Sequence, residues 1–210
     1  MRTILCYGDS NTWGKDPESE GRFSFTIRWP GVLQQQLGMS FRVIEEGLCG
    51  RTTVFDDPLS PWRNGKQYLM PCLESHKPID LCIIMLGTND LKTRFSLTAA
   101  EIAEGAEMLI DLVHTTETGS GAGSPPVLLV SPPLVRGDVP EHDMLVGAAQ
   151  KSRSFAACYR ETAERTGCLY FDAACIEVSE LDGVHISEEG HRMLGEKLAS
   201  VILKYFQDYP

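Results

Sequence analysis

The chain has 210 residues, of which 42% are hydrophobic, and its formal net charge is -10 at pH 7. A chain of this length can bury a full core without metal ions or disulfides, and it predicts a single domain over residues 1–210. The acidic composition contains no cluster of lysine or arginine, so nucleic acids and anionic membranes are not expected partners. No apolar run approaches the length of a membrane span.

Seven cysteines form no C-x-x-C pair, and several of them lie in apolar runs such as Asp80–Leu86. They predict buried, reduced thiols rather than a disulfide framework or a zinc site. The polar stretch that begins at Gly8 comes too early for a signal peptide, so a cytoplasmic location is expected. No metal or cofactor is expected, because four of the histidines lack the spacing of metal ligands. These are His76, His114, His142 and His191.

Five short apolar segments predict the strands of a sheet. Most are near-continuous in hydrophobicity rather than alternating, which indicates burial on both faces and therefore a parallel sheet. In chain order the predicted strands are Thr3–Tyr7, Phe41–Glu45, Leu81–Leu86, Val127–Ser131 and Leu169–Phe171.

Helical patterns lie between these strands. An apolar face begins at Trp29 and ends before Gly38, and the next clear helix opens with Thr98 and Glu101 at capping-box spacing. A weaker helical pattern covers Ala148–Arg165, and Ser187 is the expected cap of the last helix. The alternation of strand and helix predicts an α/β fold with helices on both sides of the sheet. Two long connections, Gly50–Gly65 and Pro132–Gly147, are expected to be ordered and functional.

Polar clusters follow the predicted strands, and in an open α/β sheet ligands bind outside the carboxyl ends of the strands. These clusters are therefore expected to converge in one cleft. They are Gly8–Asn11, Glu46–Thr53, Leu86–Asp90, Ser131–Pro133 and Leu181–Ser187.

Three residues of these clusters are candidates for nucleophilic catalysis. Ser10 is the candidate nucleophile, and His185 is the base that a serine hydroxyl needs. Asp182 lies three residues before His185, close enough in a turn to accept a hydrogen bond from its Nδ1. Alone, Ser10 is explained as a turn residue or a helix cap, and Asp182-x-x-His185 as a turn before a surface histidine. Their combination at strand ends favours a catalytic triad.

Acyl transfer also needs donors for a developing oxyanion. The backbone N–H of Gly50, the side-chain amide of Asn89 and the Ser10 N–H are the candidates. Taken singly, Gly50 is an ordinary loop glycine and Asn89 an ordinary helix cap.

Four blocks of this sequence resemble, in order, those of the SGNH (GDSL-type) hydrolases. They are Gly8–Ser10, Gly50, Gly87–Asp90 and Asp182-x-x-His185. The serine, glycine, asparagine and histidine of that name fall on Ser10, Gly50, Asn89 and His185. Further stretches, among them "VSPP" and "DGVHIS", resemble the aryl esterase/acyltransferase branch over nearly the whole chain. The resemblance implies a flavodoxin-like three-layer α/β/α sandwich with a five-stranded parallel sheet. It also implies a serine esterase of short-chain, acetyl-type esters that uses no cofactor and transfers acyl groups to alcohols or peroxide.

The chain departs from the family pattern at two positions beside the site. Asn11 stands where leucine is usual, and Cys49 stands where serine is common before the oxyanion glycine. Both affect the expected preference for acyl group or alcohol, but neither removes a catalytic group. Residues expected to wall the substrate pocket are Asn11, Trp13, Phe55, Trp62 and Leu134.

Ordinary packing explains the apolar members of that set equally well. The two long loops also carry Pro58, Pro61, Trp62 and Val135, which would form apolar patches on a monomer. The resembled branch forms closed oligomers up to octamers, so a homo-oligomer is expected.

Other functions fit parts of the sequence. A flavodoxin-like protein would bind the phosphate of FMN with its first loop and lack hydrolase activity, but Asp182-x-x-His185 would then have no role. A noncatalytic binding or scaffold protein leaves the four blocks unexplained. A third alternative uses Cys49 as the nucleophile, and iodoacetamide sensitivity would reveal it.

Overall fold

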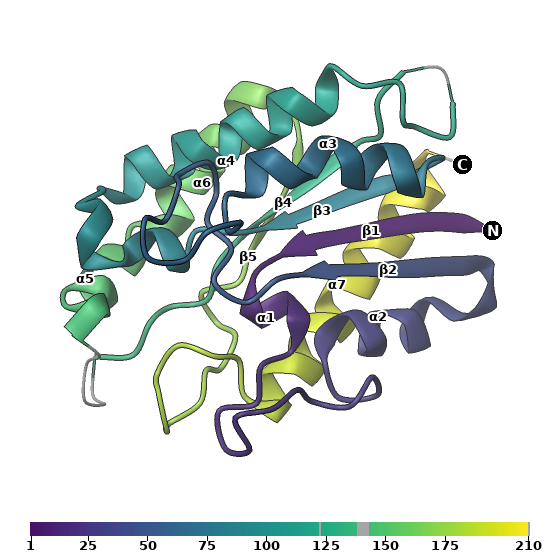
Figure 1. Cartoon of the computed structure of the whole chain (residues 1–210). Helices are drawn as coiled ribbons and strands as arrows, with labels where there is room; N and C mark the ends of the chain where they lie inside the picture. Colours follow the sequence, from purple (N-terminus) through teal and green to yellow (C-terminus); the bar gives the residue numbers. More distant parts are fainter. Residues whose placement is uncertain (122, 138–142, 210) are drawn as a thin grey trace.

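The computed structural model describes residues 1–121, 123–137 and 143–209 (Figure 1). Five parallel strands form one sheet in the order β2-β1-β3-β4-β5. This is the flavodoxin-like order, and it confirms the predicted fold class. The strands are β1 (Arg2–Gly8), β2 (Phe41–Gly47), β3 (Leu81–Met85), β4 (Val127–Ser131) and β5 (Leu169–Asp172).

Helices cover both faces of this sheet, as Figure 1 shows. One face packs against α2 (Trp29–Leu37) and α7 (Glu188–Asp208), and the other against α3 (Gly65–His76), α4 (Ala99–His114) and α6 (Phe155–Thr166). Successive side chains of β1 serve the two cores in turn, because strand residues alternate between faces. Leu5 and Tyr7 join the α3/α4/α6 core, whereas Ile4 and Cys6 join the α2/α7 core.

The helix caps expected from the sequence are present. The Thr98 side chain and Glu101 form a reciprocal capping box at α4, and the Ser187 side chain accepts the Gly190 N–H at α7. The weak pattern over Ala148–Arg165 proves to be two helices, α5 (Ala148–Ser152) and α6, separated by a turn. Helix α3 was not expected from the sequence, because its apolar periodicity is weak and Pro71 lies in its interior.

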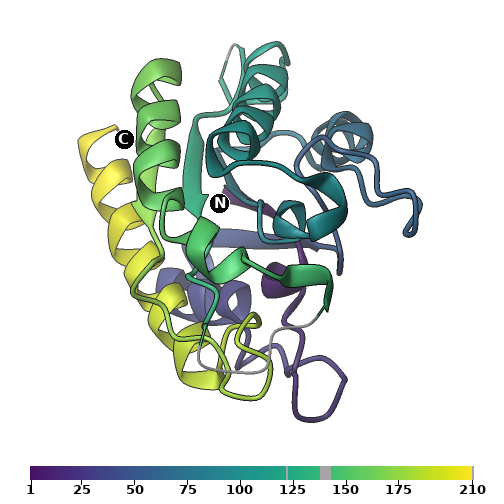
Figure 2. The ribbon, with the colours of Figure 1, turned by 90° about the vertical axis from the view of Figure 1, so that its left-hand side faces the viewer.

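Short elements complete the carboxyl end of the sheet, which faces the viewer in Figure 2. They are α1 (Ser10–Trp13), η2 (Asn89–Leu91), η3 (Thr93–Phe95) and η4 (Asp143–Leu145). A further short element, η1 (Gly38–Ser40), precedes β2 at the amino end of the sheet. Residues 138–142 of the predicted long loop, with His142, lie outside the described residues. No helix in the described part of the chain combines the length and the apolar character needed to cross a lipid bilayer. All seven cysteines are free thiols.

Candidate active site

The first strand delivers Ser10 to the carboxyl edge of the sheet. β1 ends at Gly8, and Asp9 caps the short helix α1 by accepting the backbone N–H of Asn11 at 2.9 Å. Ser10 is therefore the first residue of a helical turn, where backbone N–H groups point outward. This position suits a hydroxyl that must approach a polar substrate atom.

A hydrogen-bonded relay joins Ser10 to two residues from the far end of the chain. The Ser10 Oγ lies 3.0 Å from His185 Nε2, and His185 Nδ1 lies 2.6 Å from Asp182 Oδ2. The other carboxylate oxygen of Asp182 accepts the backbone N–H groups of Val184 and His185, each at 3.0 Å. The carboxylate thus fixes both the loop and the imidazole.

The pKa of Asp182 keeps this carboxylate ionised. Burial by itself raises the pKa, but the hydrogen bonds from the His185 ring and from the backbone of Val184 and His185 outweigh burial. The net pKa of Asp182 is lowered below its ordinary value. An ionised Asp182 holds the proton of His185 on Nδ1, which leaves Nε2 free to accept the proton of Ser10.

Asn11 clamps the loop that carries His185. Its Oδ1 accepts the Ile186 N–H at 2.9 Å, and its Nδ2 donates to the Val184 carbonyl at 3.4 Å. These two bonds flank His185 on both sides, and Asn11 is only 2% exposed. Leucine, the usual family residue here, makes neither bond. Asn11 therefore positions the imidazole from behind and does not line the cavity at Ser10.

The glycine and the asparagine expected to hold an oxyanion lie beside Ser10. Gly50 is the third residue of a turn that closes between the Arg51 N–H and the Leu48 carbonyl, and its φ of +83° favours glycine. Asn89 begins η2, and its Nδ2 donates to the Arg51 carbonyl at 3.2 Å. Gly50 and Asn89 border one cavity with Ser10 and His185.

Two buried carboxylates lie behind these groups. Burial raises the pKa of Asp9 to about 6, and burial likewise raises the pKa of Asp90 to about 6. Asp90 is held by Thr53, whose Oγ1 donates at 2.6 Å and whose backbone N–H donates at 3.0 Å. Asp9 lies 3.5 Å from the Asn89 amide. Both carboxylates therefore hold the backbone around the site together.

Two hollows open at Ser10 and share much of their lining. One, of about 190 Å³, adds Thr88, Leu145 and Val184 to the shared groups. The other, of about 420 Å³, adds Trp13, Cys49 and Gly50. The residues that border both are Ser10, Asn89, Lys92, Met144 and His185. We call these two hollows the small lobe and the larger lobe of the cleft. The relay lies where the two lobes meet.

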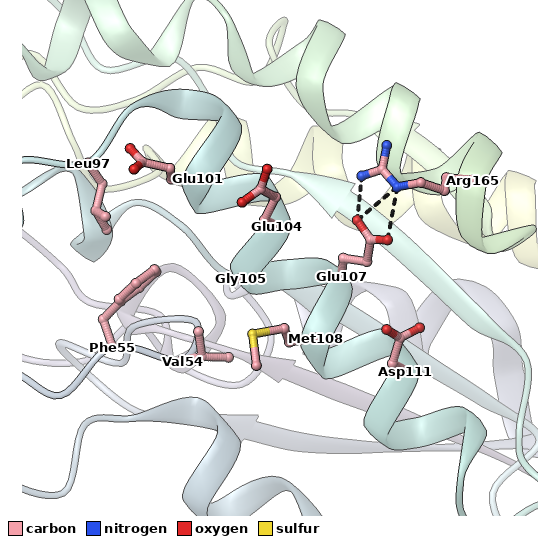
Figure 3. Close-up of a pocket in the computed structure, with 10 residues that line it drawn as sticks. All are labelled: Val54, Phe55, Leu97, Glu101, Glu104, Gly105, Glu107, Met108, Asp111 and Arg165. Carbon is pink, nitrogen blue, oxygen red and sulfur yellow. Dashed lines mark hydrogen bonds and ion pairs between the residues drawn. The ribbon is translucent and has the colours of Figure 1, made fainter.

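Of the other four predicted pocket residues, only Trp13 is brought to this cleft. Trp13 borders the larger lobe, but Phe55 lines a separate hollow of about 700 Å³ between the 54–55 segment and α4 (Figure 3). There Arg165 pairs with Glu107 at 2.9 Å, away from Ser10. Trp62 and Leu134 line two further hollows.

Five residues that border the cleft were not expected from the sequence. They are Lys15, Glu20, Lys92, Met144 and Leu145. Lys92 lies only three residues after Asn89 in the chain, so its position near the site could have been predicted from the sequence. Its ammonium lies 3.5 Å from Asp57, a buried carboxylate that Arg94 also contacts at 3.2 Å. Burial lowers the pKa of Lys92 below its ordinary value.

Comparisons with known proteins identify the family of this chain. Residues 6–193 match the model of the GDSL-like Lipase/Acylhydrolase family. The aryl esterase of M. smegmatis is 42% identical, with a TM-score of 0.90 over 97% of this chain and 99% of that one. A carbohydrate acetylesterase from Sinorhizobium meliloti is 37% identical, with a TM-score of 0.90 over 98% of this chain and 100% of that one. No curated protein matches the chain by sequence.

The fold and these matches define a carboxylic ester hydrolase of the α/β/α type. The chain belongs to the GDSL-like lipase/acylhydrolase family. This assignment does not favour the flavin-binding alternative.

The buried Asp90 gives the protein a distinctive pH dependence. Its pKa in the folded chain, about 6, exceeds the ordinary value of 3.8, so the folded state binds more protons between these values. The free energy of unfolding therefore falls as pH rises from about 4 to 7, by on the order of 3 kcal/mol for this group. In denaturant titrations at several pH values, the free energy of unfolding of Asp90→Asn should fall less with rising pH than that of wild type. The control Asp111→Asn, on the surface of α4, should show the same fall as wild type. Equal slopes in Asp90→Asn and wild type would contradict the assignment.

Proposed function

We propose that the protein is a serine esterase that hydrolyses short-chain, acetyl-type esters through an acyl-enzyme. The observation that carries the proposal is the relay itself, with 3.0 Å from the Ser10 hydroxyl to His185 and 2.6 Å from His185 to Asp182. It opens onto a cleft large enough for a small ester. The same arrangement of hydroxyl, imidazole and carboxylate performs acyl transfer on unrelated folds.

The reaction has two halves. In the first, Ser10 Oγ attacks the ester carbonyl carbon while His185 Nε2 takes the hydroxyl proton. The tetrahedral intermediate collapses, the bond to the alcohol oxygen breaks, and His185 returns the proton to the departing alcohol. In the second, His185 deprotonates a water molecule that attacks the acyl-serine, and the acid leaves as Ser10 recovers its proton.

We assign the oxyanion of each intermediate to three hydrogen-bond donors whose residues border the larger lobe. The N–H groups of Ser10 and Gly50 and the Asn89 amide form this set. In acyl-transfer enzymes each such donor contributes ~10²–10³ in kcat. The bond from Asn89 to the Arg51 carbonyl holds the amide ready beside Ser10, and Asp9 lies behind it.

The two lobes suggest how the ester is held. We assign the acyl group to the small lobe of about 190 Å³, because Met144, Leu145 and Val184 offer it apolar walls. The alcohol then lies in the larger lobe beside Trp13 and Gly50. The name of the carbohydrate acetylesterase supports a short acyl group. An alcohol or a peroxide bound in the larger lobe would replace water in the second half and receive the acyl group.

We also propose a homo-oligomer, of up to eight chains, in the cytoplasm. Trp62 is 82% exposed on the loop after β2, beside the exposed Pro58, Leu59 and Pro61, and such a patch is typical of an interface. Val135, expected in the same role, is instead buried against the α4/α6 side of the core. The free cysteine thiols support a reducing compartment.

Removal of the nucleophile tests the mechanism. Ser10→Ala should lower kcat/KM for 4-nitrophenyl acetate by about a thousandfold or more, because no acyl-enzyme forms. Ser131→Ala, which changes another serine at a strand end but outside both lobes, should retain turnover. Substantial activity in Ser10→Ala that iodoacetamide abolishes would transfer the role to Cys49.

The acyl assignment predicts a change in chain-length preference. Leu145→Ala enlarges the small lobe, so the ratio of kcat/KM for 4-nitrophenyl butyrate to that for the acetate should rise roughly tenfold. Leu134→Ala, in a separate hollow, is the matched control and should leave the ratio unchanged. An unchanged ratio in Leu145→Ala would place the acyl group elsewhere.

The oligomer is tested by light scattering after gel filtration at micromolar concentration. Wild type should have a mass several times that of one chain, and Trp62→Asp should shift it to a smaller species. Met39, which is 95% exposed just after α2, provides the control Met39→Asp with unchanged mass. A monomeric wild type would refute the proposal.

A further inference from the structure

A second group of reactive side chains lies outside the cleft, between β2 and α3. Glu46 stands near the end of β2, and Cys72 and His76 stand one turn apart on α3. One potential ligand atom from each residue lies within 4.8 Å of the other two. The cluster is separate from the relay, so a ligand bound there would not depend on the proposed esterase mechanism.

We propose that Glu46, Cys72 and His76 bind a Zn²⁺ ion, with water as the fourth ligand. A thiolate, an imidazole and a carboxylate are the three ligand types that zinc prefers, whereas Mg²⁺ and Ca²⁺ prefer oxygen alone. The carboxylate and the thiolate together balance the charge of the ion. Three protein ligands and one open position complete a tetrahedron.

The backbone already holds the ligands in place. Cys72 and His76 are four residues apart on a helix, a spacing that puts both side chains on one face. Glu46 is held by the pairing of β2 with β1 opposite Tyr7, and its carbonyl accepts a hydrogen bond from Arg51. Such second contacts orient metal ligands. The Tyr68 side chain, a further turn back along the same face of α3, lines the same hollow as Glu46.

Only a small movement is needed to admit the ion. His76 Nε2 and Glu46 Oε1 now form a hydrogen bond of 2.7 Å. Zinc bonds to nitrogen and oxygen of about 2.1 Å in a tetrahedron require these atoms about 3.4 Å apart. A rotation of either side chain opens that gap, because both side chains are about one-fifth exposed, 20% for Glu46 and 23% for His76.

The Glu46 side of the proposed site is open to solvent. Glu46 lines a hollow of about 490 Å³ together with Arg51, Trp62 and Tyr68. Binding replaces the hydrogen bond between His76 and Glu46 by two bonds to the metal. The Cys72 thiol forms the third bond, and its proton passes to water. No electron is transferred. The bound ion would tie β2 to α3 next to the turn that carries Gly50.

Titration of the full chain with Co²⁺ in place of Zn²⁺ tests the site. A cobalt ion bound by a thiolate has a sulfur-to-metal charge-transfer band, and four-coordinate cobalt has strong visible bands. Wild type should bind one Co²⁺ per chain with both signals, and Zn²⁺ should abolish them. His76→Gln should weaken binding about tenfold or more, and Cys72→Ser should eliminate the charge-transfer band.

Matched variants exclude incidental binding. His114 ends α4 as His76 ends α3, so His114→Gln should bind Co²⁺ like wild type. Cys158→Ser, a helical cysteine of α6, should likewise change nothing. His76 is partly exposed, so its variant should fold even where the buried Cys72 variant does not, and circular dichroism checks both.

Thermal unfolding supplies a second readout. Zn²⁺ at about one hundred times its dissociation constant should raise the Tm of wild type by roughly 5–10 °C, and it should not raise the Tm of His76→Gln. The proposal is overturned by the absence of a charge-transfer band at millimolar Co²⁺. It is also overturned by a band that survives in Cys72→Ser but disappears in Cys49→Ser, or by undiminished binding in folded His76→Gln.

Discussion

The active site depends on one buried side chain, the carboxamide of Asn11, which joins the end of β1 to a loop about 175 positions later in the chain. Its bonds to Val184 and Ile186 enclose His185 from both sides. β1 lies inside the sheet and is rigid, whereas the 181–187 segment has no regular structure of its own before α7. The two Asn11 bonds fix the backbone on both sides of His185 relative to the end of β1. They therefore help to hold His185 Nε2 at 3.0 Å from the Ser10 hydroxyl.

The carboxylates around the site divide into two kinds by environment. Asp182 receives three hydrogen bonds and has a lowered pKa, so it remains charged and orients the imidazole. Asp9 and Asp90 are more deeply buried, and burial raises the pKa of each to about 6. They stabilise the backbone around the site. Asp9 caps α1, and Asp90 links Thr53 to η2, the turn that begins at Asn89. In the proposed mechanism, similar side chains thus serve catalysis in one place and folding in another.

The sequence predicted what depends on continuous or strongly periodic patterns. The near-continuous strands and the Thr98–Glu101 capping box are local signals, and the structure confirms both. Helix α3 was missed because Pro71 and a weak apolar stripe hide it. The sequence also predicted that Ser10 and His185 lie close together, because both follow parallel strands whose carboxyl ends share one edge of the sheet. The directions of the Phe55 and Trp62 side chains could not be predicted, because no local pattern determines them in a loop. The approach of Glu46 to Cys72 and His76 is likewise a property of tertiary packing, visible only once β2 and α3 are placed.

In the proposed mechanism Ser10 alone carries the acyl group. Reaction of the wild-type protein with a fluorophosphonate, followed by peptide mass spectrometry, measures this directly. We expect a single phosphonyl adduct, located on Ser10, whose formation slows strongly when His185 is replaced by Ala. An adduct on another residue, or labelling of Ser10 at an undiminished rate without His185, would contradict the mechanism.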